Sequence, residues 1–191
     1  MIVSDLPPST DVSQKEALIE IVPHDPGWPA KFEAERRVLQ SILAPWLNGP
    51  IEHVGSTAIP GMPAKPVIDI MAAVSTLEAS QAAISELAKA DYIYFPYRPE
   101  IMHWLCKPSA AFRTHHLHLV PFGSKRWREC LAFRDTLLCN RDLATEYAAL
   151  KCRLASEFRF DREAYTQGKT PFVERVLREG KGPVEKPQPP S

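Results

Sequence analysis

The stretch HVGSTAIPGMPAKPVIDI, residues 53–70, contains the strongest structural signals in the chain. A short β-rich segment, residues 51–54, ends at Gly55, and the prolines and glycine that follow predict a loop up to residue 66. A near-continuous apolar run then covers residues 67–74, interrupted by one carboxylate, Asp69. Such a run is typical of a central strand that is buried on both faces. This stretch therefore predicts two strands joined by a loop, with one acid inside the sheet.

The pattern outside this stretch changes from mixed to purely helical near residue 121. The segments with strand-like patterns are residues 18–22, 92–95, 101–106 and 116–120. The segments with helical spacing are residues 29–47, 76–90, 124–138, 141–158 and 161–178, with Ser124 and Asn140 as N-caps of the third and fourth. This order predicts an α+β fold, with a mixed sheet in residues 18–120 and a C-terminal helical layer in residues 121–179.

Length and composition favour one globular domain. The chain has 191 residues, 45% of them hydrophobic, which suffices for a core without a metal or disulfide. We assign residues 18–179 to this single domain. Residues 1–17 are expected to form a flexible arm, and the proline-rich residues 180–191 a disordered tail.

Charge and cysteine usage exclude several classes of function. Lys plus Arg and Asp plus Glu both number 23, so the zero formal charge argues against bulk binding of nucleic acid or acidic membrane. No apolar run is long enough to span a bilayer, and no secretory signal is evident at the start. The four cysteines lack CxxC spacing, which predicts free thiols and a cytoplasmic location.

Gly55, Ser56, Thr57 and Asp69 are the first candidate site. A glycine lets a phosphate approach the backbone closely, and the two hydroxyl residues supply donors to an anion. Asp69, on the adjacent strand, would then hold a divalent cation against the phosphate oxygens. The simpler interpretation is a plain turn, with Asp69 hydrogen-bonded to neighbouring backbone. A lone carboxylate in an apolar strand favours the functional interpretation, because burial without a partner costs several kcal/mol.

A second candidate is the pair His116 and His118 in the strand pattern HHLHLV. Their spacing of two places both on one face of the strand, a recurring arrangement in metal sites. If residues 101–106 and 116–120 form a hairpin, Trp104 and Cys106 would flank them. The alternative is two half-buried histidines bonded to backbone. His118 is the candidate for a metal ligand or general base, since histidine titrates near neutral pH.

Several motifs in order resemble the GrpB family of small, poorly characterised proteins. The motifs are EHVGST (52–57), KPVIDI (65–70), HLHLV (116–120), FRD (133–135), EYAALK (146–151) and KTPF (169–172). The resemblance covers about residues 19–178. It draws attention to Arg134, Tyr147, Lys151 and Lys169 as partners of a phosphate, together with Lys65, although a solvated surface charge is the simpler interpretation of any one of them.

The GrpB family is similar in fold to the nucleotidyltransferases of the polymerase-β type, whose signature is Gly-Ser followed by Asp-x-Asp. Here Gly55-Ser56 is followed by 12 residues and then Asp69. The second carboxylate should fall at Met71, which cannot bind Mg²⁺. Two-metal phosphoryl transfer normally uses two or three carboxylates. Either His116 and His118 complete a different metal site with Asp69, or the catalytic machinery is degraded.

These observations lead to one expected function and two rivals. The resemblance implies metal-dependent transfer of a nucleoside monophosphate from an NTP to a small-molecule acceptor, with Mg²⁺ or Mn²⁺ as cofactor and Zn²⁺ as an alternative. The first rival is a nucleotide- or phosphate-binding module without turnover. The second is a metal-dependent hydrolase that uses Asp69, His116 and His118. The acceptor, the base, the metal and the oligomeric state are left open.

Overall fold

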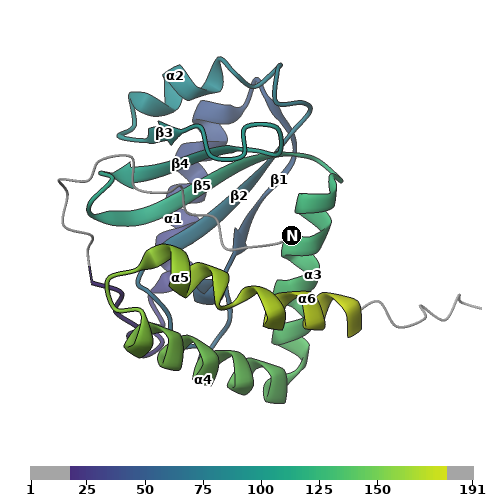
Figure 1. Ribbon diagram of the computed structural model, residues 1–191. Coiled ribbons are helices and arrows are strands. Elements are labelled where there is room, and N and C mark those ends of the chain that lie inside the picture. Colours follow the sequence, from purple (N-terminus) through teal and green to yellow (C-terminus); the bar gives the residue numbers. More distant parts are fainter. Residues whose placement is uncertain (1–17, 180–191) are drawn as a thin grey trace, which may run out of the picture.

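Five strands form one mixed sheet at the centre of the computed structural model, which describes residues 18–179 (Figure 1). The strands are β1 (Leu47–Val54), β2 (Ile68–Val74), β3 (Ile93–Phe95), β4 (His103–Pro108) and β5 (Arg113–Pro121). Their order across the sheet is β1-β2-β5-β4-β3, with β2 and β5 parallel and every other pair antiparallel. The predicted α+β class and mixed sheet are confirmed. The expected arm, residues 1–17, and tail, residues 180–191, lie outside the described residues.

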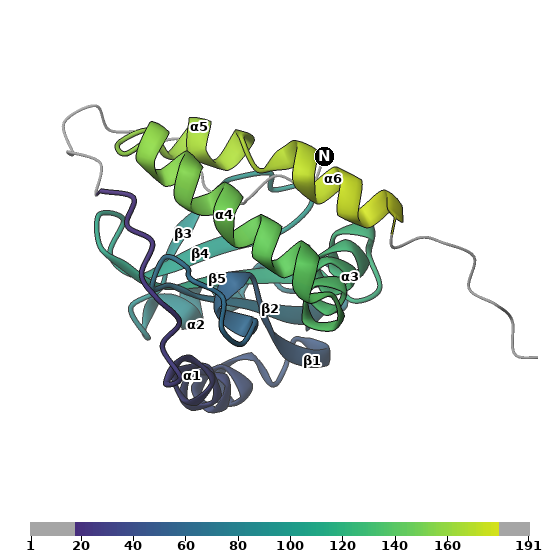
Figure 2. The same ribbon diagram turned by 90° about the horizontal axis from the view of Figure 1, so that it is seen from below.

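Helices cover both faces of this sheet. They are α1 (Trp28–Leu43), η1 (Ser56–Ala58), α2 (Ala83–Ala88), α3 (Lys125–Cys139), α4 (Arg141–Glu157), α5 (Arg162–Gln167) and α6 (Thr170–Glu179). Figure 2 shows α1 and α2 on one side of the sheet and the layer of α4, α5 and α6 on the other. The N-caps predicted at Ser124 and Asn140 are confirmed, since each side chain accepts a backbone N–H of its helix. None of the described helices is long and apolar enough to cross a membrane.

The main core lies between α1, α2 and the sheet. Alternate residues of β2, such as Ile70 and Ala72, are fully buried there with Leu117 of β5 and Leu39 of α1. The opposite side of β2 packs under α3, where Met71 contacts Trp127 within a smaller cluster. Both faces of β2 are therefore covered, as its apolar sequence predicts.

The structure corrects three sequence predictions. Residues 18–22 make only an isolated bridge, Val22 to Ala64, instead of a strand. The helix predicted at 76–90 is reduced to α2, because Ser80 binds the carbonyl oxygens of Thr76 and Leu77 and holds the preceding segment as turns. The helix predicted at 161–178 divides into α5 and α6, since Pro171 cannot donate a helical hydrogen bond.

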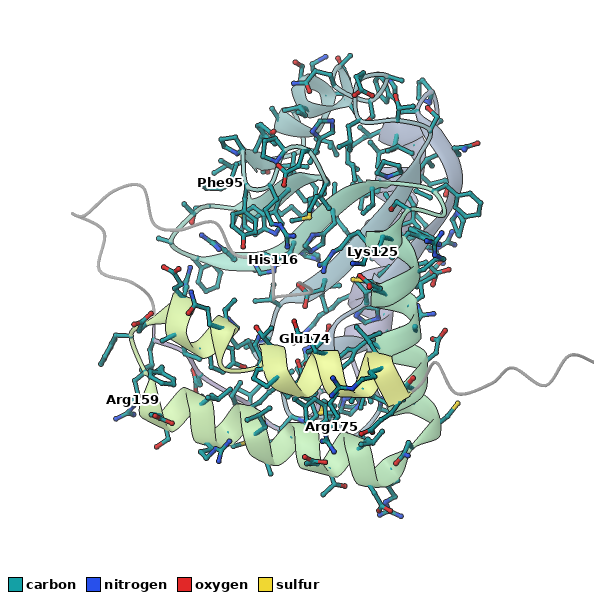
Figure 3. The ribbon with its side chains drawn as sticks, turned by 45° about the vertical axis from the view of Figure 1, so that its right-hand side comes forward. Phe95, His116, Lys125, Arg159, Glu174 and Arg175 are labelled. Atoms are coloured by element: carbon teal, nitrogen blue, oxygen red, sulfur yellow. The ribbon has the colours of Figure 1, made fainter. Side chains whose placement is uncertain are left out.

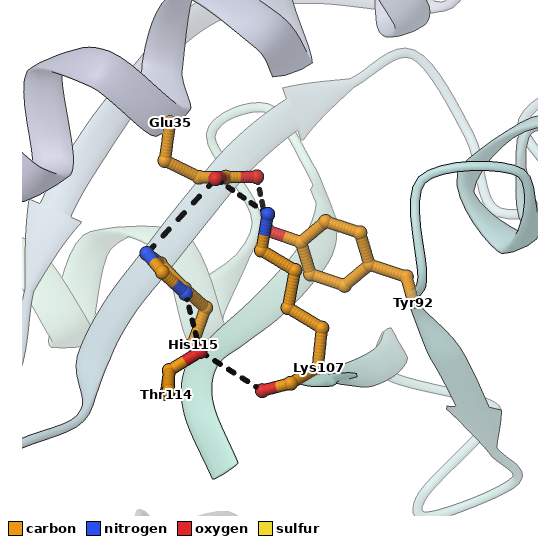
Figure 4. Close-up of polar contacts among 5 residues, drawn as sticks. All are labelled: Glu35, Tyr92, Lys107, Thr114 and His115. Carbon is orange, nitrogen blue, oxygen red and sulfur yellow. Dashed lines mark hydrogen bonds and ion pairs between the residues drawn. The ribbon is translucent and has the colours of Figure 1, made fainter. Parts of the chain in front are cut away.

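A buried polar network joins α1 to β4, to β5 and to the residue just before β3 (Figure 4). Glu35 of α1 accepts from Lys107 Nζ at 2.6 Å and from Tyr92 Oη at 2.9 Å. His115 Nε2 lies 4.0 Å from the same carboxylate, and its Nδ1 lies 2.9 Å from Thr114 Oγ1. Because Glu35 is buried, these partners compensate the cost of removing its charge from water.

Candidate functional site

The parallel pairing of β2 with β5 aligns the residues singled out in the sequence. Asp69 is opposite His116 and Met71 is opposite His118, all on the face covered by α3. The hairpin of β4 and β5 places Cys106 opposite His116 and Trp104 opposite His118, as expected from the sequence. His115 and Leu117 face the other way, toward α1 and the main core. The strand alternation thus separates the candidate site from the Glu35 network.

Asp69 and His116 form a close pair. His116 Nδ1 lies 2.8 Å from Asp69 Oδ1. Burial alone would raise the pKa of Asp69, but the hydrogen bond from His116, with a smaller effect of the Lys65 charge, holds it below its ordinary value. Burial lowers the pKa of His116 against the opposing effect of Asp69, so the ring is neutral and Nδ1 carries the proton that it donates. His116 is packed against Trp104, with ring centroids 5.1 Å apart.

Gly55 forms the tight entry to the loop beside Asp69. Its φ of 69° lies in the left-handed region, and a Cβ at this position would collide with Asp69 Oδ2 and lie 2.9 Å from Asp69 Cβ. A side chain here would therefore displace the carboxylate. Glycine is required at this position for both its backbone angle and its small size.

A cavity of about 140 Å³ opens at this point, between the sheet and the helical layer. Six of the predicted site residues line it: Gly55, Ser56, Asp69, His118, Tyr147 and Lys169. Burial lowers the pKa of His118 to about 4, so its imidazole is neutral at physiological pH. His116 supports Asp69 from behind without lining the cavity. We call this space the inner cavity.

Three lysines bring positive charge to the inner cavity. Lys169 lines it, and its Nζ lies 4.4 Å from the ring centroid of Tyr165. Lys65 Nζ lies 4.9 Å from the same ring, and Lys151 Nζ donates to the carbonyl oxygen of Pro63. Burial lowers the pKa of Lys169 to about 8 and those of Lys65 and Lys151 to about 7. Repulsion by Lys169 lowers the latter two further, while Asp69 opposes the shift in all three. The three ammonium groups are therefore electrostatically linked to one carboxylate.

Two predicted phosphate partners lie away from the inner cavity. Thr57 is buried, accepts from His53 Nε2 at 3.0 Å and donates to the carbonyl oxygen of Val67 at 3.2 Å. Arg134 is paired with Glu52 and Asp135 at 2.7 and 2.8 Å. Lys65 and Lys151 act on the cavity through their charge and do not line it.

The sequence analysis did not identify four residues that line the inner cavity: Arg126, Cys130, Phe133 and Val173. The first three recur on one face of α3 at positions i, i+4 and i+7. That periodicity is visible in the sequence as a helix face. Its orientation toward Asp69 depends on how α3 packs on the sheet, for which the sequence carries no local signal.

The donor set does not fit the two-metal arrangement of nucleotidyltransferases. Met71 stands where the second carboxylate would be and is buried among Val54, Ala73, Val120 and Trp127. Between residues 18 and 179, no three His, Cys, Asp or Glu side chains form a group that could hold a metal ion. Since Asp69 already accepts from His116, it offers one carboxylate without a companion acid. The side chains of this site therefore do not support a two-metal mechanism.

Comparison with known protein families assigns this chain to one of them. The model of the GrpB protein family matches residues 18–179, which is the whole of the described structure. The chain belongs to the GrpB family. A glutamate-rich protein GrpB of Alkalihalophilus pseudofirmus is 32% identical over 83% of this chain and 94% of that protein. The predicted family resemblance is thereby confirmed.

Further relatives and a solved structure support the assignment. A UPF0157 protein of Pseudomonas aeruginosa is 39% identical over 83% of this chain, which spans 66% of that protein. The crystal structure of the conserved protein GrpB from Enterococcus faecalis matches with a TM-score of 0.77 and 30% identity, covering 84% of this chain and 96% of that one. The nucleotidyltransferase-like α+β fold is thus shared with a GrpB protein of known structure.

Two more distant relatives are named as an enzyme, dephospho-CoA kinase. A dephospho-CoA kinase of Mycolicibacterium paratuberculosis is 29% identical over 85% of this GrpB-family chain. The match covers 46% of the kinase, so this chain corresponds to about half of that protein.

Proposed function

We propose that this GrpB-family protein binds the phosphate group of a nucleotide in the inner cavity and neutralises it with lysines instead of metal ions. The observation that carries the proposal is Lys169, which is 7% exposed and lines the same cavity as Gly55, Ser56 and Asp69. A bound phosphate would lie between the Lys169 ammonium and the glycine–serine loop.

The electrostatics of the site favour an anionic guest. Three buried or half-buried lysines lie near one ionised aspartate, so positive charge outnumbers negative charge in a poorly solvated place. Burial lowers the pKa of all three lysines, and repulsion by Lys169 adds to the shift at Lys65 and Lys151. A phosphate would supply negative charge where charge-assisted hydrogen bonds are strong. Its binding would restore protons to the lysines.

The inner cavity also has the polar surface that phosphate recognition needs. Ser56 offers a hydroxyl donor, and Gly55 leaves room for an oxygen to approach the backbone. The neutral His118 offers hydrogen bonds without adding charge. The role of Asp69 is to limit repulsion among the lysines and to accept hydrogen bonds, with His116 fixing its orientation.

The relatives favour a nucleotide among phosphate-bearing molecules. Two mycobacterial proteins named dephospho-CoA kinase contain a segment similar to most of this chain. Dephospho-CoA contains an adenine nucleotide, and a kinase also takes a nucleotide as phosphate donor. A nucleotide-binding domain joined to such an enzyme is consistent with the proposal.

Transfer of a nucleoside monophosphate to a small-molecule acceptor is the second candidate function. It is favoured by Asp69, whose ionised carboxylate lines the inner cavity and could accept the proton of an attacking hydroxyl. The reaction would release pyrophosphate from an NTP, so a pyrophosphate assay with candidate acceptors tests it. A hydrolase that holds a metal with Asp69, His116 and His118 is less favoured, because those side chains form no three-ligand group among the described residues.

The proposal is tested by titration calorimetry of pyrophosphate and ATP into the protein in EDTA. Lys169→Met is compared with Lys89→Met, whose side chain is exposed and paired with Glu86 beside the far helix α2. We expect binding to the wild type and to Lys89→Met, with affinity reduced at least about tenfold in Lys169→Met, since a buried charge-assisted contact is lost. Equal binding to all three proteins, or no binding, would refute the proposal.

A further inference from the structure

A second hollow of about 310 Å³ lies where β5 ends and α3 begins. The loop after β3 contributes Arg98, Glu100 and Ile101, and α3 contributes Lys125 and Glu129. Pro121 of β5 also lines it. Figure 3 shows Lys125 at the start of α3, beside the sheet that carries His116. We call this hollow the outer pocket. Apart from Ser124, which was predicted as an N-cap, none of its residues was singled out by the sequence patterns.

The outer pocket is adjacent to the inner cavity. Arg126 lines both spaces. Along β5, His118 lines the inner cavity and Pro121 lines the outer pocket. These two residues are about 10 Å apart at the rise of an extended strand. Along α3, the inner cavity extends about 10 Å at the helical rise, from Arg126 to Phe133, while Lys125, Arg126 and Glu129 line the outer pocket. β5 and α3 therefore both contribute residues to the two spaces, which meet at Arg126.

The size of the inner cavity limits what it can hold. Its volume of about 140 Å³ is well below the roughly 300–1,000 Å³ of sites that enclose an organic ligand. It accommodates a phosphate group but not the sugar and base of a nucleotide. The outer pocket, at about 310 Å³, reaches that range.

The chemistry of the outer pocket differs from that of the inner cavity. Ile101 and Pro121 are half-buried and offer apolar surface to a flat ring. The planar guanidinium of Arg98 can stack on such a ring. Glu100 and Glu129 supply carboxylates, which accept hydrogen bonds from ribose hydroxyls or base amino groups. These two acids offset most of the positive charge of Arg98, Lys125 and Arg126, so the pocket suits a neutral, hydroxylated and aromatic group.

We infer that the outer pocket is the nucleoside subsite of this protein and that its ligand is a nucleoside phosphate whose phosphate enters the inner cavity. This inference rests on the proposed function, since it assumes that the inner cavity takes the phosphate. Arg126, at the junction, would contact the phosphate nearest the ribose.

The experiment compares pyrophosphate with the four nucleoside diphosphates ADP, GDP, CDP and UDP by calorimetry in EDTA. Ile101→Trp fills the outer pocket, and Glu100→Gln, at an exposed position, removes a charged acceptor with little risk to folding. Glu157→Gln, on an exposed surface of α4, is the matched control. Thermal unfolding of each variant shows whether it is folded. If Ile101→Trp does not fold, the result for Glu100→Gln alone tests the inference.

In the wild type, at least one diphosphate is expected to bind about tenfold tighter than pyrophosphate. Ile101→Trp should remove that advantage, and Glu100→Gln should reduce it about threefold, with pyrophosphate affinity changed by less than about twofold in both. The inference is overturned if no diphosphate binds tighter than pyrophosphate, or if the folded variants keep the full advantage. Diphosphates that bind, but no tighter than pyrophosphate, leave the proposed function standing, whereas absence of all binding removes both.

Discussion

At the scale of single residues, Gly55 and Asp69 depend on each other. The backbone of Gly55 has a φ of 69°, and the Asp69 carboxylate lies against the place where any side chain would begin. Gly61 has a similar φ of 75° but nothing within 4 Å of a Cβ. The two glycines therefore separate the effect of backbone strain from the effect of crowding.

Gly55→Ala is expected to destabilise the fold more than Gly61→Ala does, by about 1–3 kcal/mol, because only the first forces a clash. Chemical denaturation of the two variants measures the difference. Gly55→Ala should also weaken phosphate binding, since Asp69 must move, whereas Gly61→Ala should not. Equal losses of stability would show that Asp69 is not held against this glycine.

Residues differ in how far the sequence predicts their place. Gly55, Ser56 and Asp69 could be assigned to one site because a turn residue and a lone acid in an apolar strand are local signals. Lys169 was identified only by family resemblance, since an isolated lysine resembles any surface charge. Arg126 carries no local signal at all, because its contact with the cavity follows from the packing of α3.

At the scale of elements, an aromatic cluster holds the helical layer over the inner cavity. Phe133 of α3, Tyr147 of α4 and Phe172 of α6 are mutually in contact, with ring centroids 5.1–6.4 Å apart. Phe133 and Tyr147 also line the cavity. The position of the cavity wall thus depends on how these three helices pack.

Phe172→Ala is expected to lower the free energy of unfolding by about 3 kcal/mol, because Phe172 is buried in this cluster. The matched control is Phe160→Ala, since Phe160 is 65% exposed and should cost little. Urea denaturation measures both. Similar small losses in the two variants would mean that the helical layer is not held by the cluster.

The Glu35 network is the second device at this scale, and it fastens α1 to the sheet (Figure 4). Lys107→Met is expected to destabilise by about 3 kcal/mol, because it leaves the buried Glu35 carboxylate without its cation. Adding Glu35→Met should recover part of the loss. The control is Lys31→Met. Lys31 is also on α1, but it is exposed and paired with Asp25, so its loss should leave the free energy of unfolding unchanged. A double variant less stable than Lys107→Met would contradict this view of the pair.

The elements themselves were predicted where periodicity is strong and missed where side chains compete. The sheet strands and the helices after residue 124 follow their apolar patterns. The division between α5 and α6 was missed, although Gly168 and Pro171 lie at the break. That division matters for the site, because it leaves Lys169 between two helices and in the wall of the inner cavity.

At the scale of the whole molecule, the neutral net charge conceals a local excess of positive charge. The site combines Lys65, Lys151 and Lys169 with one carboxylate, while the chain as a whole is balanced. Such a local field is set by topology, which brings together segments that are far apart in the sequence. The zero net charge therefore argues against bulk binding of nucleic acid, but it does not argue against a local phosphate site.

Stability and phosphate affinity are expected to respond to pH in opposite directions. The pKa of Lys169 is about 8 in the fold against an ordinary value of 10.5, so above pH 8 the unfolded chain binds more protons at this position. The contribution of Lys169 to stability therefore rises with pH. Phosphate affinity should fall over the same range, because the ammonium loses its charge.

This prediction is measured by comparing the wild type with Lys169→Met between pH 7 and about 8.5, below the ordinary titration of tyrosine. Lys169→Met should be more stable than the wild type at pH 7, and the difference in the free energy of unfolding should narrow by roughly 0.5–1 kcal/mol as the pH rises to about 8.5. Pyrophosphate affinity of the wild type should decrease in parallel. A difference in unfolding free energy that stays constant or widens as the pH rises would contradict the claim that Lys169 is buried and charged.

The most direct test of the central claim is calorimetry of ATP binding to Asp69→Asn, with and without Mg²⁺. Asparagine keeps the shape of Asp69 and an oxygen that accepts from His116, but it removes the negative charge beside the lysines. If the lysines neutralise the phosphate, the variant binds ATP as tightly as the wild type or tighter, with or without Mg²⁺. Loss of ATP binding in the variant, together with Mg²⁺-dependent binding in the wild type, would contradict the account and establish Asp69 as a metal ligand.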